Sequence, residues 1–421
     1  MRYAVVGFGT AGYHAVKEIR NYDTEGEIHV YGDTGKAPCN PMLTTYYVSG
    51  KLDRAGLYPF GPLKELEKKL DFTYHHETVK QVHGESRCVE TGLGKQAYDR
   101  ILIATGASAF APAVKGLEAE DCFLMRTVED AQRLKDRLEK TRVKYAVVVG
   151  ASMAGIKVAE VLKQHGVKVC LADLAPSIFS LAAYRDVAGA IEERVRGQGV
   201  RLCFEKTIDH MEVEAGQQVA VMTDKSRIPA DVVCLCIGTR ANVSVVKDQV
   251  AVNRGILVNE QMETSVPGIY GAGDCCEGRN LGNGQSQIIG LWANANRQGT
   301  VAGASMAGQK ASFGGNILHN ITHFMNMDFI GFGDNRIQGE ILETGSLENG
   351  LFIRLVVKDG VVAGANILDN YRISGIVKNY MLRLFSGDKG PLPDYQRAML
   401  VKAGLTAGFI AQVEEKINGQ S

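Results

Sequence analysis

Two glycine-rich loops are the segments of this sequence whose residue types and spacing point most directly to chemistry. The first, within RYAVVGFGTAGYHAVKEIR, has the full G-x-G-x-x-G spacing at Gly7, Gly9 and Gly12. The first glycine permits a tight turn, the second lets a diphosphate approach the backbone, and the third allows a helix to pack closely on a strand. A helix that begins with Thr10 and Ala11 would direct free N–H groups at the phosphates.

The second loop lies within KYAVVVGASMAGIKVAEVLKQHG and keeps the same spacing with one change. Gly150 and Gly155 occupy the outer glycine positions, and Ser152 replaces the middle glycine. Because serine is small, a diphosphate can still approach the backbone here, although less closely. Met153 and Ala154 complete the loop, so a second dinucleotide site is predicted.

Each loop is followed by a helical pattern and then by a short apolar strand that ends at an aspartate. Asp33 ends the first such strand and is placed to accept hydrogen bonds from ribose hydroxyls. Asp173 ends the second, and its charge would repel the 2′-phosphate of NADP(H). The next residues, Leu174 to Pro176, include no arginine, so NAD(H) is favoured over NADP(H).

The elements that position these residues form two β–α–β units, each opened by a β-branched apolar run that is typical of a buried parallel strand. Further buried strands are predicted in YDRILIATG, ADVVCLCIG and GIYGAGD, and a small-residue helix over 291–308. From about Gln309 the pattern changes to alternating strands, and Asp359-Gly360 is a hairpin signal. The predicted fold is α/β, with two doubly wound Rossmann-like dinucleotide-binding domains and a C-terminal α+β interface domain.

Composition excludes several function classes. Among 421 residues, 47 lysines and arginines balance 47 aspartates and glutamates, so no nucleic-acid footprint is expected. No apolar run approaches the roughly 20 residues that cross a bilayer, and the start MRYAVVGFG does not resemble a signal peptide. Nine cysteines without a C-x-x-C pair suit free thiols in the cytoplasm.

No metal site is predicted. His319 and His323 have the spacing that places two imidazoles on one face of a helix, as in some zinc sites. However, no third ligand supports this interpretation, and the surrounding residues are more typical of a strand.

Taken together, the motifs resemble one family. GFGTAG, ILIATGA, VVVGASMAG, LCIGTRANV and TSVPGIYGAGD occur in this order over about residues 1–310, as in the FAD-dependent pyridine nucleotide–disulfide oxidoreductase superfamily. The resemblance implies that the first fold binds FAD and the second NAD(H). It also implies that Asp274 bonds the ribityl chain of the flavin and that backbone groups near Leu291 face its pyrimidine edge. The further FAD-binding residues that it implies are Thr105, Gly106, Arg126, Gly238, Gly273 and Trp292.

The resemblance also suggests how the chain is divided. The expected domains are an FAD-binding domain in two parts, an inserted NAD-binding domain, and a C-terminal interface domain. Their expected ranges are 1–111 and 237–308 for FAD, 112–236 for NAD, and 309–421 for the interface domain. In the family the last domain usually builds a dimer, so a homodimer or a subunit of a larger redox complex is expected.

Within the family, CNPMLTTYYVSGKL resembles the nitrite reductase flavin domain and the rubredoxin or ferredoxin reductases, but with departures. Cys39 stands where a tyrosine is expected and Pro41 where an arginine is expected. A lysine–glutamate pair found near the flavin in many relatives is absent, because the two positions hold Thr45 and Lys157. Lys157 could then face the flavin–nicotinamide junction as a catalytic residue, or point into solvent from its helix.

Cys39 is the only cysteine close in sequence to the first loop, and no resolving cysteine accompanies it. It is either a catalytic thiol or an ordinary residue of the flavin pocket. Peroxidase relatives carry a histidine at the position of Thr10, which counts against peroxide chemistry here. The preferred function is therefore hydride transfer between NADH and FAD, with electrons passing on to a redox partner protein or subunit, or to a small oxidant. The alternatives are a Cys39-assisted NADH oxidase or disulfide reductase, and a non-catalytic FAD/NAD(H) redox sensor.

Overall fold

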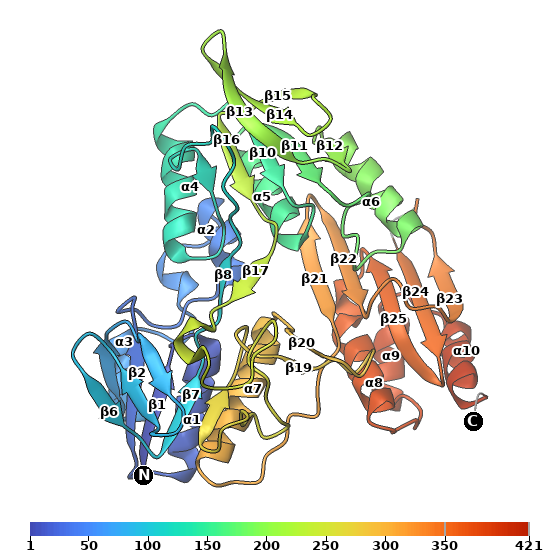
Figure 1. The fold of residues 1–421 in the computed structure, drawn as a ribbon. Coiled ribbons are helices and arrows are strands. Elements are labelled where there is room, and N and C mark those ends of the chain that lie inside the picture. The colour runs from blue at the N-terminus through green and yellow to red at the C-terminus, as the bar shows by residue number, and fades with distance from the viewer. Residues whose placement is uncertain (349–350, 420–421) are drawn as a thin grey trace. The chain divides into compact units, whose positions relative to one another are not determined.

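The computed structural model describes residues 1–348 and 351–419. Its backbone divides into two compact units, each containing one five-stranded parallel sheet (Figure 1). The first unit comprises residues 1–110, 126–132 and 238–316, and the second comprises residues 111–125, 133–237 and 317–421. In this division the chain from residue 317 belongs with the second fold. The three functional domains predicted above, with the FAD-binding domain in two parts, stay a prediction.

The main sheet of the first unit has the strand order β18-β7-β1-β2-β3. Its strands are β1 (Arg2–Val6), β2 (Glu27–Gly32), β3 (Thr73–His76), β7 (Arg100–Ile103) and β18 (Ile269–Gly271). The helices of this unit are α1 (Thr10–Tyr22), α2 (Thr44–Val48), α3 (Leu63–Leu70) and α7 (Trp292–Met306). Smaller sheets are formed by β4 (Gln81–His83), β5 (Cys88–Glu90) and β6 (Lys95–Ala97), by β8 (Ala107–Ala109) with β17 (Thr239–Ala241), and by β19 (Gly278–Arg279) with β20 (Ser286–Gln287). All neighbouring strands of the main sheet are parallel, so their carboxyl ends meet at one edge.

Helices α1 and α7 pack against each other through small residues (Figure 1). A Cβ atom on Gly299 would overlap the backbone of Ala11, and one on Gly303 would overlap the backbone of Ala15. Only glycine therefore allows the two backbones to come this close. The small-residue run predicted as a helix over 291–308 is thus explained by its packing on α1, the helix that follows the first glycine loop.

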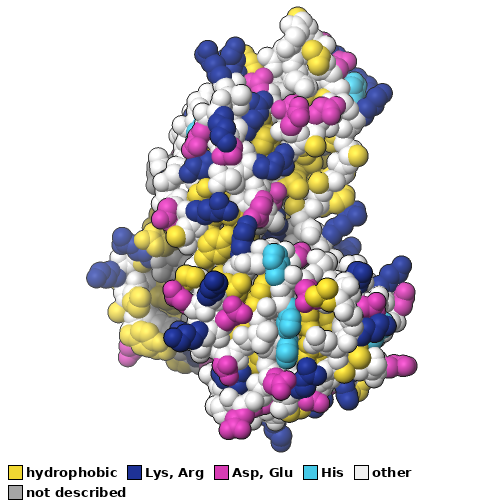
Figure 2. All heavy atoms as spheres, turned by 90° about the vertical axis from the view of Figure 1, so that its left-hand side faces the viewer, with side chains coloured by type: hydrophobic (Ala, Val, Ile, Leu, Met, Phe, Trp, Pro, Cys, Tyr) yellow, Lys and Arg dark blue, Asp and Glu magenta, His cyan; other side chains and the backbone are white. Residues whose placement is uncertain are grey.

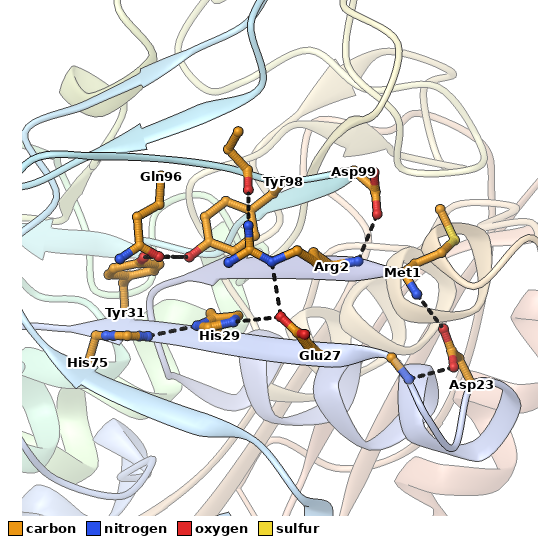
Figure 3. Close-up of polar contacts among 12 residues, drawn as sticks. Met1, Arg2, Asp23, Glu27, His29, Tyr31, His75, Gln96, Tyr98 and Asp99 are labelled. Carbon is orange, nitrogen blue, oxygen red and sulfur yellow. Dashed lines mark hydrogen bonds and ion pairs between the residues drawn. The ribbon is translucent and has the colours of Figure 1, made fainter.

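A polar cluster lies on the sheet of the first unit (Figure 3). Arg2 Nε donates to Glu27 Oε2 at 3.0 Å, and these are the first residues of β1 and β2. The imidazoles of His29 and His75 are hydrogen-bonded at 2.9 Å between β2 and β3. Since β1 and β2 begin at Arg2 and Glu27, that ion pair lies at the opposite end of these strands from the glycine loop, and it helps to fix their register.

The parallel sheet of the second unit has the strand order β12-β11-β10-β16-β9. Its strands are β9 (Cys122–Phe123), β10 (Tyr145–Val149), β11 (Lys168–Asp173), β12 (Arg201–Phe204) and β16 (Val232–Leu235). An antiparallel sheet of β13 (Ile208–Glu214), β14 (Gln217–Met222) and β15 (Arg227–Pro229) accompanies it, with helices α5 (Met153–Gln164) and α6 (Arg185–Gly197). Helix α4 (Val128–Lys140) begins in the first unit and ends in the second.

The C-terminal part of the second unit is an antiparallel sheet of order β21-β22-β25-β24-β23 with three helices. Its elements are β21 (His319–Phe324), β22 (Met327–Phe332), β23 (Glu340–Gly345), β24 (Phe352–Lys358), β25 (Val361–Leu368), α8 (Ser374–Phe385), α9 (Asp394–Lys402) and α10 (Ala407–Asn418). The predicted Asp359-Gly360 hairpin is confirmed: it joins β24 to β25, and both residues have positive φ. His319 and His323 lie on a strand, as their surroundings indicated.

Within residues 1–348 and 351–419, no helix is long and apolar enough to cross a membrane. The same residues contain no group of three or more His, Cys, Asp or Glu side chains suited to a metal ion. On the face drawn in Figure 2, basic and acidic side chains are interspersed, in keeping with the balanced charge of the chain.

Candidate dinucleotide-binding sites

The candidate FAD residues all lie in the first unit, and several of them directly follow its parallel strands. Gly7 directly follows β1, Asp33 follows β2, and Gly273 lies just beyond β18. In open α/β sheets, ligands bind in the crevice outside the carboxyl ends of the strands. Tertiary structure thus brings together segments that are far apart in the sequence.

The first glycine loop has the geometry that a diphosphate requires. A Cβ on Gly7, whose φ is +100°, would overlap the Ala104 carbonyl, and one on Gly12 would overlap the Gly7 carbonyl. A Cβ on Gly9, in contrast, would have no atom within 4 Å. The outer glycines therefore permit close packing, and the middle one faces open space that a ligand can occupy.

The start of α1 also fits a bound phosphate group. Gly9 is the N-cap residue, and no side chain caps the helix. The Thr10 hydroxyl is buried and has no hydrogen-bond partner among the described residues. Orphan helix N–H groups and an unpaired buried hydroxyl are the groups that an anionic ligand would satisfy. We propose that Gly7 to Gly12 hold the FAD diphosphate.

An ion pair lies close to the same edge of the sheet. Arg126 Nη2 donates to Asp274 Oδ2 at 2.6 Å, and Arg126 Nε donates to the Ala107 carbonyl at 3.1 Å. The Asp274 side chain is only 17% exposed. With one oxygen committed to Arg126, Asp274 keeps lone pairs that could accept from a flavin hydroxyl. Arg126 would thus orient Asp274 rather than act alone.

Two residues that the sequence analysis missed hold the candidate FAD residues in place. Thr105 Oγ1 donates to the Asn242 carbonyl at 2.6 Å, and Asn242 Nδ2 donates back to the Thr105 carbonyl at 3.0 Å. The Gly273 N–H donates to Gln298 Oε1 at 2.9 Å. Gln298 lies outside the motifs that carry the family resemblance, and Asn242, which lies within LCIGTRANV, was given no role by that motif.

The remaining candidates of this unit are Gly238 and the first residues of α7. Gly238 has φ +103° and accepts a hydrogen bond from the Phe110 N–H at 2.9 Å. Leu291 is the N-cap of α7, and no side chain caps that helix either. Trp292, the first residue of α7, stacks on Phe60 at 5.9 Å between ring centroids. These positions leave the α7 N-terminus open toward a ligand.

The second loop is built in the same way within the second unit. A Cβ on Gly150 would overlap the Cys236 carbonyl, and one on Gly155 would overlap the Gly150 carbonyl. Ser152 caps α5: its hydroxyl accepts from the Gly155 N–H at 3.4 Å and donates to the Cys236 carbonyl at 3.2 Å. Unlike α1, this helix therefore starts with one of its N–H groups already satisfied.

Asp173 is tied to that loop. Its Oδ2 accepts from the Ala151 N–H at 2.6 Å, and its Oδ1 accepts from the Ala175 N–H at 2.8 Å. Each carboxylate oxygen can accept a further hydrogen bond, so ribose hydroxyls can still be bound. The structure thus places the acid and the loop together, as a site for the adenosine half of a dinucleotide requires.

Replacing Asp173 with asparagine is expected to raise KM for NADH about tenfold, because a charge-assisted hydrogen bond to the ribose is lost. The preference for NADH over NADPH should fall as well, since the charge that repels a 2′-phosphate is removed. Comparing kcat/KM for both donors checks this. Asp209→Asn, on β13, serves as a control, and an unchanged NADH/NADPH ratio in Asp173→Asn would contradict the assignment.

A comparison with known families identifies the chain. The model of a family described as pyridine nucleotide-disulphide oxidoreductase matches residues 1–299. The chain belongs to this family. The resemblance seen in the motifs is therefore confirmed, and the chain is an NAD(P)H-dependent, FAD-containing oxidoreductase with FAD and NAD(H) as cofactors.

Individual relatives of this oxidoreductase carry different names. The NAD(P)H sulfur oxidoreductase (CoA-dependent) of Pyrococcus furiosus is 27% identical over 97% of this chain and 92% of its own length. Subunit epsilon of the NADH-dependent phenylglyoxylate dehydrogenase of Aromatoleum evansii is 24% identical over 91% of each chain. The structure of the water-forming NADH oxidase of Lactobacillus brevis bound to NADH has a TM-score of 0.86 at 21% identity, over 98% of this chain and 99% of that one. The structural match confirms the predicted fold class.

Lys157 of this oxidoreductase is bound by neighbours within the second unit. Its ammonium pairs with the Glu160 carboxylate and donates to the His323 carbonyl at 2.8 Å, and its side chain is only 14% exposed. Lys157 therefore does not point freely into solvent. These contacts favour a role in anchoring α5 to β21, and a catalytic role for Lys157 stays a prediction.

Cys39 lies just before the turn at Pro41 and is partly buried. Burial raises the pKa of the Cys39 thiol, which disfavours the reactive thiolate. Among the described residues there are two thiol–thiol contacts, Cys170–Cys203 and Cys275–Cys276, and neither involves Cys39. The structure thus brings no resolving cysteine to Cys39.

Proposed function

We propose that this oxidoreductase transfers electrons between NAD(H) and FAD and passes them on to a redox partner protein or subunit. The observation that carries the second step is the isolation of Cys39, whose thiol has a raised pKa and no neighbouring thiol. When bound, FAD accepts a hydride from NADH and can release electrons singly or in pairs. Without a second thiol beside Cys39, the reduced flavin would pass its electrons directly to the acceptor and not through a dithiol relay.

In this proposal the residues of the chain bind and orient the two cofactors. Gly7 to Gly12 and the start of α1 hold one diphosphate, while Asp274, oriented by Arg126, accepts from the flavin side chain. Gly150 to Gly155 hold the other diphosphate, with Asp173 at the ribose. Holding both partners in fixed positions turns hydride transfer into an intramolecular step, which is the main contribution that the protein makes.

Replacing Cys39 with serine is expected to leave NADH turnover within about twofold of wild type with every acceptor that the wild type reduces, oxygen and small disulfides included, because a protonated thiol takes no part in the reaction. The steady-state rate of NADH oxidation in the presence of each acceptor measures this. Cys88→Ser, on β5 of the same unit, is the matched control.

Loss of turnover in Cys39→Ser but not in Cys88→Ser would support a thiol-assisted NADH oxidase or disulfide reductase instead, consistent with the names of several relatives. If wild-type protein binds both cofactors but turns over no acceptor, and its reduced form persists in air, a redox sensor would be the better description.

A partner subunit is supported by one relative and by the surface of the chain. The Aromatoleum evansii relative is named as a subunit of a dehydrogenase, and the match spans 91% of both chains. Several large apolar side chains on the C-terminal part of the second unit are exposed: Tyr371, Tyr395, Met399 and Val401. Tyr395 and Met399 lie one helical turn apart on α9, and exposed apolar side chains that adjoin in this way are typical of contact surfaces. We propose that this part contacts a second copy or a partner subunit.

We also place the reaction in the cytoplasm. All nine cysteines are free thiols, which suits a reducing compartment. Analysis of the proteins that copurify with the chain, and of which of them the NADH-reduced flavoprotein reduces, tests both the partner and the electron acceptor.

A further inference from the structure

The loop between β11 and α6, residues 174–184, has an unusual conformation at Phe179. Phe179 has φ +51°, in the left-handed region that bulky side chains rarely adopt, and it is only 4% exposed. Such a conformation costs free energy and persists only when its surroundings hold it. The contacts that hold Phe179 therefore indicate what the loop is shaped to do.

The side chain of Phe179 is held by two aromatic residues of the C-terminal sheet. Its ring stacks on Phe329 of β22, with centroids 4.9 Å apart and planes at 9°. It also meets Phe324 of β21 edge-on, with centroids 5.6 Å apart. Both partners are fully buried. Aromatic pairs of this geometry add stabilisation beyond the area that they bury, so the ring is firmly anchored.

The backbone of Phe179 is hydrogen-bonded to the second glycine loop. The Phe179 N–H donates to the Ala151 carbonyl at 3.0 Å, and the Ala151 N–H donates to Asp173 Oδ2 at 2.6 Å. Ala151 is therefore fixed through both its N–H and its carbonyl. A continuous chain of contacts runs from the aromatic anchor through the glycine loop to the acid at the ribose position.

The rest of the loop is bound to β25 of the same sheet and to the segment between β22 and β23. Asn366 Nδ2 donates to the Ala182 carbonyl at 2.8 Å, and Asn335 Nδ2 donates to the Ser180 carbonyl at 2.8 Å. Helix α5 is held there too, since Glu160 Oε1 accepts from the Met325 N–H at 2.8 Å. The C-terminal sheet thus supports both segments that flank the second dinucleotide site.

We propose that Phe179 is a positioning residue for the adenosine half of NAD(H), through which the C-terminal sheet sets the geometry of Ala151 and Asp173. This inference rests on the proposed function of the second loop as the NAD(H) site. Without the ring, the strained backbone at Phe179 would relax, its hydrogen bond to Ala151 would be lost, and Asp173 would no longer be held in a binding geometry.

The test uses FAD-replete protein and ADP-ribose, the part of NAD(H) that lacks nicotinamide, with binding measured by calorimetry. Phe179→Ala is expected to weaken ADP-ribose binding at least about tenfold, whereas Phe179→Leu, which keeps an apolar anchor, should stay within about threefold. Reduction of the flavin by reduced nicotinamide mononucleotide, which has no adenosine, should stay within about twofold of wild type. Phe409→Leu, which changes a buried phenylalanine on α10 of the same unit, is the matched control.

Unchanged ADP-ribose affinity in Phe179→Ala would overturn the inference, and so would an equal loss in Phe409→Leu or a parallel loss of the mononucleotide reaction. If Phe179→Ala does not fold, Phe329→Leu decides: affinity weakened about threefold or more supports the inference, and unchanged affinity overturns it. Failure of the wild-type protein to bind ADP-ribose would instead refute the proposed function, so the two failures are distinguishable.

Discussion

Protein with Gly12 replaced by alanine is expected to carry less than about a tenth of the wild-type flavin. The added Cβ would overlap the Gly7 carbonyl, which is backbone and cannot turn away. Helix α1 would have to move off β1, and with it the N–H groups and the Thr10 hydroxyl that face the diphosphate. A shift worth about 1.4 kcal/mol already changes binding tenfold. The ratio of released FAD to protein, measured before and after reconstitution, checks this.

The matched control for this variant is Gly92→Ala in the same unit. A Cβ on Gly92 would have no atom within 4 Å, so this protein should keep its flavin. Normal flavin content in Gly12→Ala would show that the first loop does not hold FAD, and the assignment of the first fold would have to be abandoned.

Replacing Gly155 with alanine is expected to raise KM for NADH by about a hundredfold or more while leaving the flavin in place. Its Cβ would overlap the Gly150 carbonyl, so α5 could no longer approach the loop. Ser152, which caps α5, and Ala151, which bonds Asp173, would both be displaced. The rate at which NADH bleaches the flavin absorbance under anaerobic conditions, measured over a range of NADH concentrations, gives the result.

Gly189→Ala is the control for the second loop, because Gly189 lies on α6 and its added Cβ would have open space around it. The two glycine variants together separate the two sites. Gly12→Ala should lose the flavin, whereas Gly155→Ala should keep the flavin and bind NADH weakly. If Gly155→Ala instead loses FAD and is reduced normally after reconstitution, the two folds have been assigned in the wrong order.

The parts of this protein that were predictable are those with a local signal. A buried strand, a glycine turn and a helix follow one another directly at Gly7 and again at Gly150, so residue type and spacing suffice to place both loops. The hairpin at Asp359-Gly360 was predictable for the same reason, since only two residues decide it.

The contacts that hold the site residues in place had no local signal in the sequence. Arg126 and Asp274 are 148 residues apart, and nothing in either segment names the other as its partner. For Lys157 the sequence left open both a position at the flavin–nicotinamide junction and a position in solvent. The folded chain places it against Glu160 and the His323 carbonyl.

The presence of two dinucleotide folds, the residues of their loops and the acids that follow their strands could thus be derived from sequence, because each follows from backbone requirements within a short stretch. The contacts that hold those residues in place became visible only in the folded chain. These contacts are the hydrogen bonds of Arg126 with Asp274, of Asn242 with Thr105, and of Phe179 with Ala151. They depend on which distant segments of the chain pack together. The burial of apolar side chains over the whole chain determines this packing, and no single motif encodes it.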